Sequence, residues 1–212
     1  MEDDKKYLKG TTTVGIVCKD GIVLGADMRA TAGNLIVNKE TEKVVRITDN
    51  IIVTMAGTVS DAQLLCKYLS AELNLMKIRN NHEPTVKEAA NLMSSFVYGN
   101  IRKMSMIPGV AHFLMAGKDN SGYYLYDIFA DGSLTEENKF VTSGSGSVFA
   151  LGVLESTYKE NMSVSDGVDL VFKSINAALQ RDTYSGNGIN IFTVTKDGVK
   201  KELSKSVNTS VN

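Results

Sequence analysis

Residues 10–26 read GTTTVGIVCKDGIVLGA, and this stretch decides how the fold begins. Val14, Ile16 and Cys18 fall on one face of an extended chain, a period of two that is typical of a β-strand. The polar triplet KDG follows at 19–21, and the run 22–26 is again apolar. Two strand-like runs around an Asp-Gly turn predict an antiparallel β-hairpin.

Strand patterns continue to residue 57. Residues 43–47 and 51–57 are rich in β-branched side chains and are joined by the polar stretch 48–50, which predicts a second pair of strands. The period then changes to spacings of three and four residues, which predicts a helix that begins at a capping box in residues 60–63. Its apolar stripe consists of Ala62, Leu65, Leu69, Leu73 and Met76.

The rest of the chain repeats this alternation. A second capping box at 85–88 predicts a helix that ends before Pro108. Further strands are expected at 110–116, 123–129 and 140–141, helices at about 148–158 and 164–181, and a final hairpin at 189–195 and 199–203. The helix at 164 is expected to start from Ser163.

The order of these elements predicts the fold class. Strand-rich blocks alternate with pairs of helices, and hairpin turns replace single crossover helices, so the sheets are expected to be antiparallel. Two sheets packed face to face with a helical layer outside each give an α+β fold, a four-layer α-β-β-α sandwich. We expect one domain over 11–212, with residues 1–10 and about 204–212 as tails.

Composition excludes several classes of function. The 212 residues are 43% apolar and 22% charged, and 23 basic residues balance 24 acidic ones, so no electrostatic attraction to nucleic acid or to an anionic membrane is expected. No apolar run is long enough to cross a bilayer, and the charged N-terminus does not resemble a secretory signal. We expect a soluble, intracellular protein.

The sequence offers no cofactor site. Cys18 and Cys66 are far apart and flanked by apolar residues, so they are expected to be buried thiols in a reducing compartment. The two histidines, His82 and His112, are equally isolated, and no zinc site can be built from these four residues. The Gly- and Ser-rich stretch 143–147 lacks a nucleotide-binding pattern. No metal and no other cofactor are expected.

Three consecutive threonines follow Gly10, and the first of them, Thr11, is a candidate nucleophile. If the Gly10–Thr11 bond is cut, Thr11 carries both a hydroxyl and a free α-amine. An α-amine titrates near pH 7.7–8.0, so part of it is neutral at pH 7 and can accept the hydroxyl proton. Such a residue supplies its own base for acyl transfer.

Three other residues could support this chemistry. Lys43 shares a strand face with apolar residues, where an ammonium needs a counter-charge, and Asp27 at the end of the first hairpin could supply it. The positive field of Lys43 could lower the proton affinity of Thr11. Gly57, between a strand and a helix, could present its backbone N–H to an oxyanion.

Taken together, these segments resemble the β subunits of the 20S proteasome, and specifically the catalytic archaeal type. The resemblance runs from Gly10 to about residue 203. It rests on the junction 10–15, Asp27-x-Arg29, Lys43, and the segments 56–62, 144–146, 152–155 and 181–186.

The resemblance implies an N-terminal nucleophile (Ntn) hydrolase fold and autocatalytic cleavage between Gly10 and Thr11. It implies that Thr11 is the nucleophile of a threonine-type endopeptidase and that Gly57 binds the oxyanion, while Thr31 and Gly57 hold the substrate backbone. The remaining members of the implied catalytic network are Asp27, Lys43, Ser145, Asp182 and Ser185.

The resemblance also implies substrates and partners. The pocket for the residue before the scissile bond (P1) would be lined by Ala30, Val45, Met55 and Val59, which predicts a preference for hydrophobic P1 residues. Heptameric β rings would pair and be capped by rings of α subunits in the cytoplasm. Unfolded polypeptides would be the substrates, delivered by an ATPase unfoldase through the α ring.

Two alternatives remain open. The bacterial two-ring protease shares an N-terminal Thr-Thr, although the 181–186 motif and the length favour the proteasome. A non-catalytic ring subunit that serves assembly is the second alternative. Against it, this chain has Thr11 together with Lys43.

Overall fold

The predicted first hairpin is present. The computed structural model describes residues 10–207, so the expected leader before residue 10 and the tail after residue 207 lie outside the described residues. Strand β1 (Thr13–Cys18) pairs with β2 (Gly21–Asp27) in an antiparallel register that runs from Thr13 opposite Ala26 to Cys18 opposite Gly21. The two-residue turn Lys19-Asp20 therefore fixes the register of the hairpin, and Gly21 is already part of β2.

This hairpin forms the centre of a five-stranded antiparallel sheet in the order β10-β1-β2-β11-β12. The other strands are β10 (Phe140–Ser143), β11 (Gly188–Thr195) and β12 (Gly198–Ser206). A second five-stranded sheet follows the order β5-β6-β7-β8-β9 and is also antiparallel. Its strands are β5 (Val44–Arg46), β6 (Ile51–Gly57), β7 (Ala111–Asp119), β8 (Gly122–Ile128) and β9 (Leu134–Glu137).

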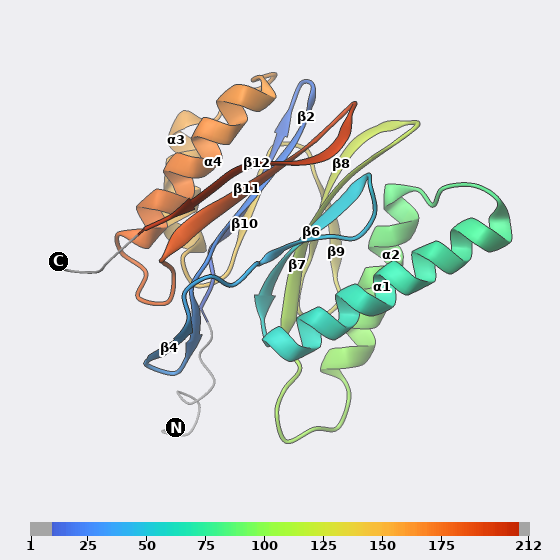
Figure 1. Cartoon of the computed structure of the whole chain (residues 1–212), viewed down its shortest axis with the longest axis horizontal. Helices are drawn as coiled ribbons and strands as arrows, with labels where there is room; N and C mark the ends of the chain where they lie inside the picture. The colour runs from blue at the N-terminus through green and yellow to red at the C-terminus, as the bar shows by residue number, and fades with distance from the viewer. Residues whose placement is uncertain (1–9, 208–212) are drawn as a thin grey trace.

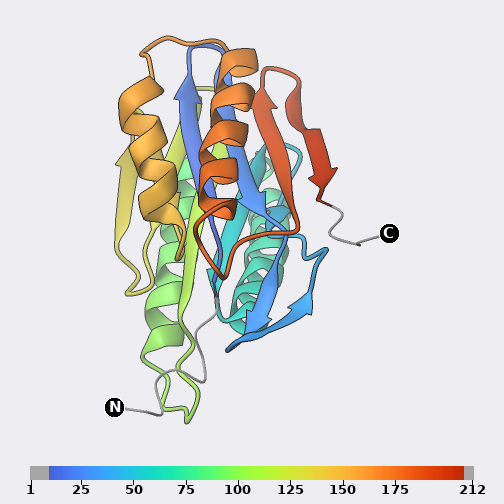
Figure 2. The ribbon, with the colours of Figure 1, turned by 90° about the vertical axis from the view of Figure 1, so that its left-hand side faces the viewer.

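Helices cover the outer face of each sheet. They are α1 (Val59–Asn80), α2 (Val86–Ile101), α3 (Ser147–Thr157) and α4 (Val164–Leu179). In Figure 1, α1 and α2 lie outside the second sheet and α3 and α4 outside the first. Figure 2 shows α3 and α4 in front of the first sheet. The predicted four-layer α-β-β-α sandwich is confirmed.

Three apolar clusters hold the layers together. One lies between the two sheets and includes Ile22, Leu24, Ile52 and Leu114, all fully buried. The second joins α1 and α2 to their sheet, and the third joins α3 and α4 to theirs. Because each sheet buries both faces, its strands are apolar on both sides, and this explains why the alternation of period two is weak in 22–26 and 51–57.

Two of the three predicted N-terminal helix caps are confirmed. Thr85 accepts a hydrogen bond from the N–H of Glu88 at 3.2 Å, and the Glu88 carboxylate accepts one from the N–H of Thr85 at 2.7 Å, which is a complete capping box. Ser163 caps α4 by accepting the N–H of Asp166 at 3.1 Å.

The predicted start of α1 is wrong. The N-cap is Thr58, whose N–H donates to Val110 O at 2.7 Å, and the helix has already begun when the chain reaches Ser60. The Ser60 hydroxyl instead lies 3.3 Å from the carboxylate of Asp61. The pairing of β6 with β7 carries the chain to residue 57 and fixes this earlier start, so tertiary contact overrides the local capping signal.

The sequence patterns also missed strands. A short hairpin of β3 (Ala30–Ala32) and β4 (Leu35–Asn38) projects from the end of the sandwich at which β1 begins, as Figures 1 and 2 show. The whole of β4 is exposed, so no buried face gives it a period. Strand β9 was not expected, β12 continues past the expected end at residue 203, and α4 ends at Leu179 rather than 181. Within residues 10–207, none of the helices has the length and apolar character that a bilayer span requires.

Candidate active site

Thr11 lies buried at the entrance to β1, with its hydroxyl against the preceding peptide bond. Its Oγ1 donates a hydrogen bond to the carbonyl oxygen of Gly10 at 2.7 Å. Lys43 Nζ lies 3.4 Å from the same carbonyl oxygen. The bond predicted to be cut therefore has the predicted nucleophile and a cation at its carbonyl group.

Asp27 is the polar centre of this region. Its Oδ1 accepts hydrogen bonds from Lys43 Nζ at 2.7 Å and from the Thr12 N–H at 2.9 Å. Its Oδ2 accepts the N–H groups of Arg29 and Gly186, each at 3.0 Å. The residue is fully buried, and four donors compensate for the water that its carboxylate has lost.

Burial changes the acidity of Lys43. Loss of solvent lowers the pKa of its ammonium group below the ordinary value, and the adjacent Asp27 carboxylate offsets part of that effect. The ion pair places Nζ between the Asp27 carboxylate and the Gly10 carbonyl. Lys43 can therefore polarise that carbonyl, and its proton is more easily given up than that of a lysine in water.

A second carboxylate serves the other side of Thr11. Ser145 Oγ lies 3.3 Å from the Thr11 backbone nitrogen, which donates to it, and Ser145 in turn donates to Asp182 Oδ2 at 2.6 Å. The Ser185 hydroxyl donates to the same Oδ2 at 2.6 Å and lies 2.7 Å from the Thr12 hydroxyl. The nitrogen that would become the free amine is thus already held by this network.

Two glycines allow the 143–147 turn to approach Thr11 closely. Gly144 has a φ of 90°, and a Cβ built there would lie 2.0 Å from Thr11 O. A Cβ on Gly146 would lie 1.9 Å from the Thr12 hydroxyl. A side chain at either glycine would push the turn, and Ser145 with it, away from Thr11.

Gly10 fits tightly between two segments. Its N–H points to the Thr31 hydroxyl on β3 at 3.4 Å. A Cβ at residue 10 would lie 1.7 Å from the Cβ of Tyr184 and 2.8 Å from Ser145 Oγ. Only glycine therefore fits before Thr11 unless the chain moves.

The structure joins the six predicted side chains of the catalytic network, although their roles stay predictions. A continuous set of hydrogen bonds runs from Thr11 through Ser145, Asp182, Ser185, Thr12, Asp27 and Lys43 back to the carbonyl of Gly10.

Gly57, the predicted oxyanion donor, ends β6 opposite Ala111. It has a φ of 101°, and a Cβ would lie 2.2 Å from Val110 O, so the backbone requires glycine here. Its role as a hydrogen-bond donor to substrate stays a prediction.

The four predicted P1-pocket residues come from four elements. Ala30 is half-buried on β3, and Val59 begins α1 with 37% of its surface exposed. Val45 on β5 and Met55 on β6 pack against the same apolar cluster. That they line one pocket stays a prediction.

Sequence reasoning missed two supporting groups. Arg29 donates from Nε to Asn187 Oδ1 and from Nη1 to Thr183 O, both at 2.8 Å, and so fixes the turn that carries Ser185. His112 joins Asp127 to Ser143. Arg29 had a signal in the Asp27-x-Arg29 pattern, whereas the partners of His112 are on separate strands and leave no local pattern.

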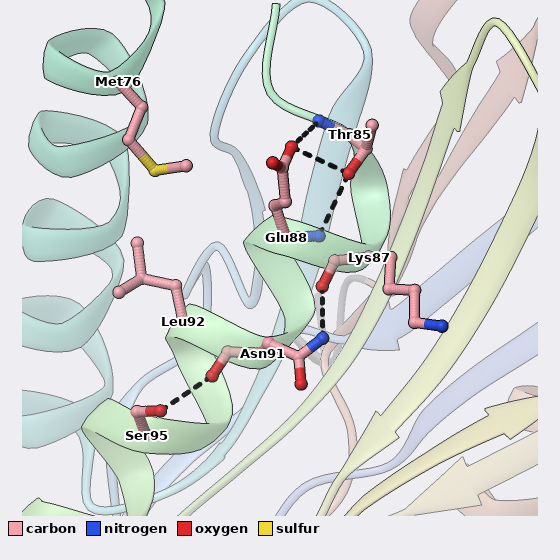
Figure 3. Close-up of a pocket in the computed structure, with 7 residues that line it drawn as sticks. All are labelled: Met76, Thr85, Lys87, Glu88, Asn91, Leu92 and Ser95. Atoms are coloured by element: carbon pink, nitrogen blue, oxygen red, sulfur yellow. Dashed lines mark hydrogen bonds between the residues drawn. The ribbon is translucent and has the colours of Figure 1, made fainter. Parts of the chain in front are cut away.

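A separate pocket lies between α1 and α2, with a volume of about 560 Å³ (Figure 3). Met76 and Leu92 form its apolar part, and several of its polar groups bond to one another, as in the Thr85–Glu88 capping box. It shares no residue with the Thr11 network. Within residues 10–207, no three His, Cys, Asp or Glu side chains are grouped so as to hold a metal ion.

Comparison with known proteins gives a consistent result. Residues 7–194 match the family described as "Proteasome subunit". "Proteasome subunit beta" of Methanococcus aeolicus is 45% identical over 197 residues, which cover 92% of this chain and 89% of the relative. The protein of the same name in Methanosarcina barkeri is 42% identical over 212 residues, 99% of each chain. That of Methanothermobacter thermautotrophicus is 42% identical over 203 residues, 96% of this chain and 94% of the relative.

The coverage extends from the Thr11 region through the helices of both outer layers, and the described fold is the one that the resemblance implied. The chain belongs to the family of proteasome subunits, and these relatives within that family are archaeal β subunits.

Proposed function

We propose that this chain is a catalytic proteasome β subunit, a threonine endopeptidase that exposes Thr11 by cutting its own chain after Gly10. One observation carries the proposal: the Thr11 hydroxyl lies 2.7 Å from the carbonyl oxygen of Gly10, and Lys43 Nζ reaches the same oxygen. A nucleophile and a cation at one carbonyl group are the components of acyl transfer.

This geometry supports self-cleavage by the following steps. Thr11 Oγ1 attacks the carbonyl carbon of Gly10, and collapse of the tetrahedral intermediate breaks the bond to the Thr11 nitrogen. The hydroxyl proton passes to that nitrogen, and residues 1–10 remain as an ester on Oγ1. Water hydrolyses the ester, which releases the leader and leaves Thr11 with a free hydroxyl and a free amine.

The mature residue then repeats the chemistry on substrates. The amine accepts the proton of Oγ1 as the oxygen attacks a substrate carbonyl, and it returns the proton to the leaving amine. Asp27 holds Lys43 near the reacting oxygen, and Ser145, Asp182 and Ser185 orient the amine. The Gly57 N–H stabilises the oxyanion.

Substrate and assembly are part of the same proposal. The substrates are unfolded polypeptides, bound to Thr31 and Gly57 by strand-like backbone contacts. Ala30, Val45, Met55 and Val59 accept a hydrophobic P1 side chain. The chain assembles into heptameric β rings with α-subunit rings outside, in the cytoplasm, and an ATPase acts through the α ring.

The test compares Thr11→Ala with Thr11→Ser in the full-length chain assembled with α subunits. Intact mass reports loss of residues 1–10, and fluorogenic peptides report hydrolysis. Thr11→Ser keeps the hydroxyl and is expected to retain cleavage and turnover, whereas Thr11→Ala is expected to lose both and keep the fold. Peptidase activity in assembled Thr11→Ala contradicts the mechanism.

The pocket is tested with matched peptides that differ only at P1. Cleavage is expected to be faster after Leu or Tyr than after Arg or Glu, because the proposed lining residues carry no charge. Fastest cleavage after Arg or Glu contradicts the pocket assignment but leaves the role of Thr11 intact.

A further inference from the structure

His112 links the two sheets close to the Thr11 site. It lies on β7 of the second sheet, and its Nδ1 is 2.7 Å from the hydroxyl of Ser143 on β10 of the first sheet. Its Nε2 is 2.5 Å from Asp127 Oδ1 on the adjacent strand β8. The ring of Phe129 packs edge-on against the imidazole, with 4.7 Å between centroids.

Both ring nitrogens therefore have fixed partners. An ionised carboxylate only accepts hydrogen bonds, so the proton on Nε2 belongs to the bond with Asp127. This leaves Nδ1 to bond the Ser143 hydroxyl, which can rotate to donate or to accept. Asp127 and Phe129 thus orient the ring, and the ring restrains Ser143.

Ser143 in turn begins the turn that reaches Thr11. Its backbone pairs with Thr13 at the start of β1. The next residue, Gly144, lies against Thr11 O, and Ser145 accepts the Thr11 N–H. Only Gly144 separates Ser143, whose hydroxyl His112 holds, from Ser145, whose hydroxyl orients the Thr11 nitrogen.

The three residue types also occur in hydrolytic triads, but here the serine cannot act as a nucleophile. Ser143 is only 3% exposed and is paired within the sheet. A substrate carbonyl has no approach to its hydroxyl, so the arrangement is suited to holding position rather than to attack.

We propose that His112 is a positioning residue for the Thr11 site, which acts by holding Ser143 and through it the turn that carries Ser145. The inference rests on the proposed function of Thr11. A small shift of Ser145 misplaces the amine that accepts the hydroxyl proton, and rates of acyl transfer are sensitive to such shifts.

Three substitutions of His112 separate its two bonds. His112→Asn keeps a polar group at the place of Nδ1, His112→Gln keeps one at the place of Nε2, and His112→Phe keeps ring volume without either. The full-length chain is assembled with α subunits, and peptide turnover is measured per mature site counted by intact mass. His82→Phe, at an exposed histidine outside the network, is the matched control and is expected to match wild type.

The expected result is a kcat about tenfold lower in His112→Phe and His112→Gln, with KM unchanged, because orientation rather than substrate binding is lost. His112→Asn is expected to restore most of kcat. Equal activity in His112→Asn and His112→Gln, or wild-type kcat in His112→Phe, overturns the proposal, since loss of packing alone does not distinguish the two nitrogens.

Ser143→Ala keeps the test decisive if the His112 variants do not assemble. It removes one hydroxyl and is expected to lower kcat by a similar factor, and wild-type kcat in this variant overturns the proposal. Thr11→Ala separates a failure of the proposed function from a failure of the proposed role of His112. If Thr11→Ala still cleaves peptide, the proposed function itself fails, whereas an inactive Thr11→Ala beside a fully active His112→Phe rejects only the role of His112.

Discussion

The buried Lys43–Asp27 pair has separable effects on stability and on activity. Both side chains are at least 94% inaccessible to solvent, and removing one member of a buried pair leaves an uncompensated charge that costs about 3–5 kcal/mol. Asp27 also holds three backbone N–H groups. Its carboxylate therefore supports the local backbone as well as the cation.

A double-mutant cycle tests this separation. Asp27→Asn and Lys43→Met are each expected to lower the unfolding free energy of the unassembled chain, by several kcal/mol. The double variant is expected to be more stable than the sum of the two losses predicts, because no unpaired charge remains, yet to stay inactive. Urea unfolding and peptide assays provide the measurements, and strictly additive losses would mean that the pair does not interact as described.

Gly10 offers a second test at the residue scale. Gly10→Ala is expected to slow leader release, because its Cβ would lie 1.7 Å from the Cβ of Tyr184 and displace the scissile carbonyl. Tyr184→Ala keeps that Cβ and is not expected to relieve the clash, whereas Tyr184→Gly removes it. Release followed by intact mass is therefore expected to recover in Gly10→Ala/Tyr184→Gly but not in Gly10→Ala/Tyr184→Ala, and equal rates in both would refute the steric explanation.

The start of α2 permits a matched comparison at the scale of an element. Thr85→Ala removes the hydroxyl that accepts the Glu88 N–H, and is expected to cost about 1 kcal/mol of unfolding free energy. Ser60→Ala, at the box that sequence predicted and the structure does not form, is expected to cost much less because Thr58 is the N-cap. Urea unfolding at pH 7 compares the two, and equal losses would contradict the difference in capping.

Local patterns predicted elements wherever the signal lies within a few residues. The β1–β2 hairpin and the Thr85 and Ser163 caps are of this kind, since their turn and capping residues are neighbours in sequence. The exposed strand β4 could not be found, because without a buried face it has no period. The start of α1 was misplaced because β6 pairing, a contact distant in sequence, fixes where the helix begins.

The site was less predictable than the elements. Thr11 and the Lys43–Asp27 pair could be proposed from local chemistry, but Ser145, Asp182 and Ser185 came only from the resemblance. Their hydrogen bonds to the Thr11 region span as many as 173 residues of chain, and only the packing of whole sheets brings such residues together. His112 shows the same limit, because its two partners are on other strands.

At the scale of the whole molecule, the two cysteines lie in opposite halves of the sandwich. Cys18 is buried beneath α4, and Cys66 lies on α1 within the other helical layer. Burial raises the pKa of each thiol from 9.0 to about 12, and near Cys18 the charges of Asp20 and Asp166 add to the effect. Both thiols are therefore expected to resist alkylation in the folded chain.

These pKa values predict how stability depends on pH. Between about pH 9 and 12 the thiols keep their protons in the folded chain but release them in the unfolded chain. Their contribution to the free energy of unfolding is therefore complete below pH 9. It falls as the pH rises, by at most about 1.4 kcal/mol per pH unit for each thiol. Cys18→Ala and Cys66→Ala are each expected to flatten the decline of unfolding free energy above pH 9. An unchanged slope would mean that the thiols ionise freely in the folded state.

The anchoring of Asp27 has a consequence for maturation. Within residues 10–207, the four groups that bind its carboxylate belong to residues 12, 29, 43 and 186, and all four remain in the chain after the proposed cut. In the proposed mechanism, cleavage after Gly10 breaks one peptide bond. The Asp27 carboxylate and the groups that bind it keep the positions that they have in the uncut chain. The residues around Asp27 would therefore need no rearrangement after cleavage, and the enzyme would be competent as soon as the leader has been released.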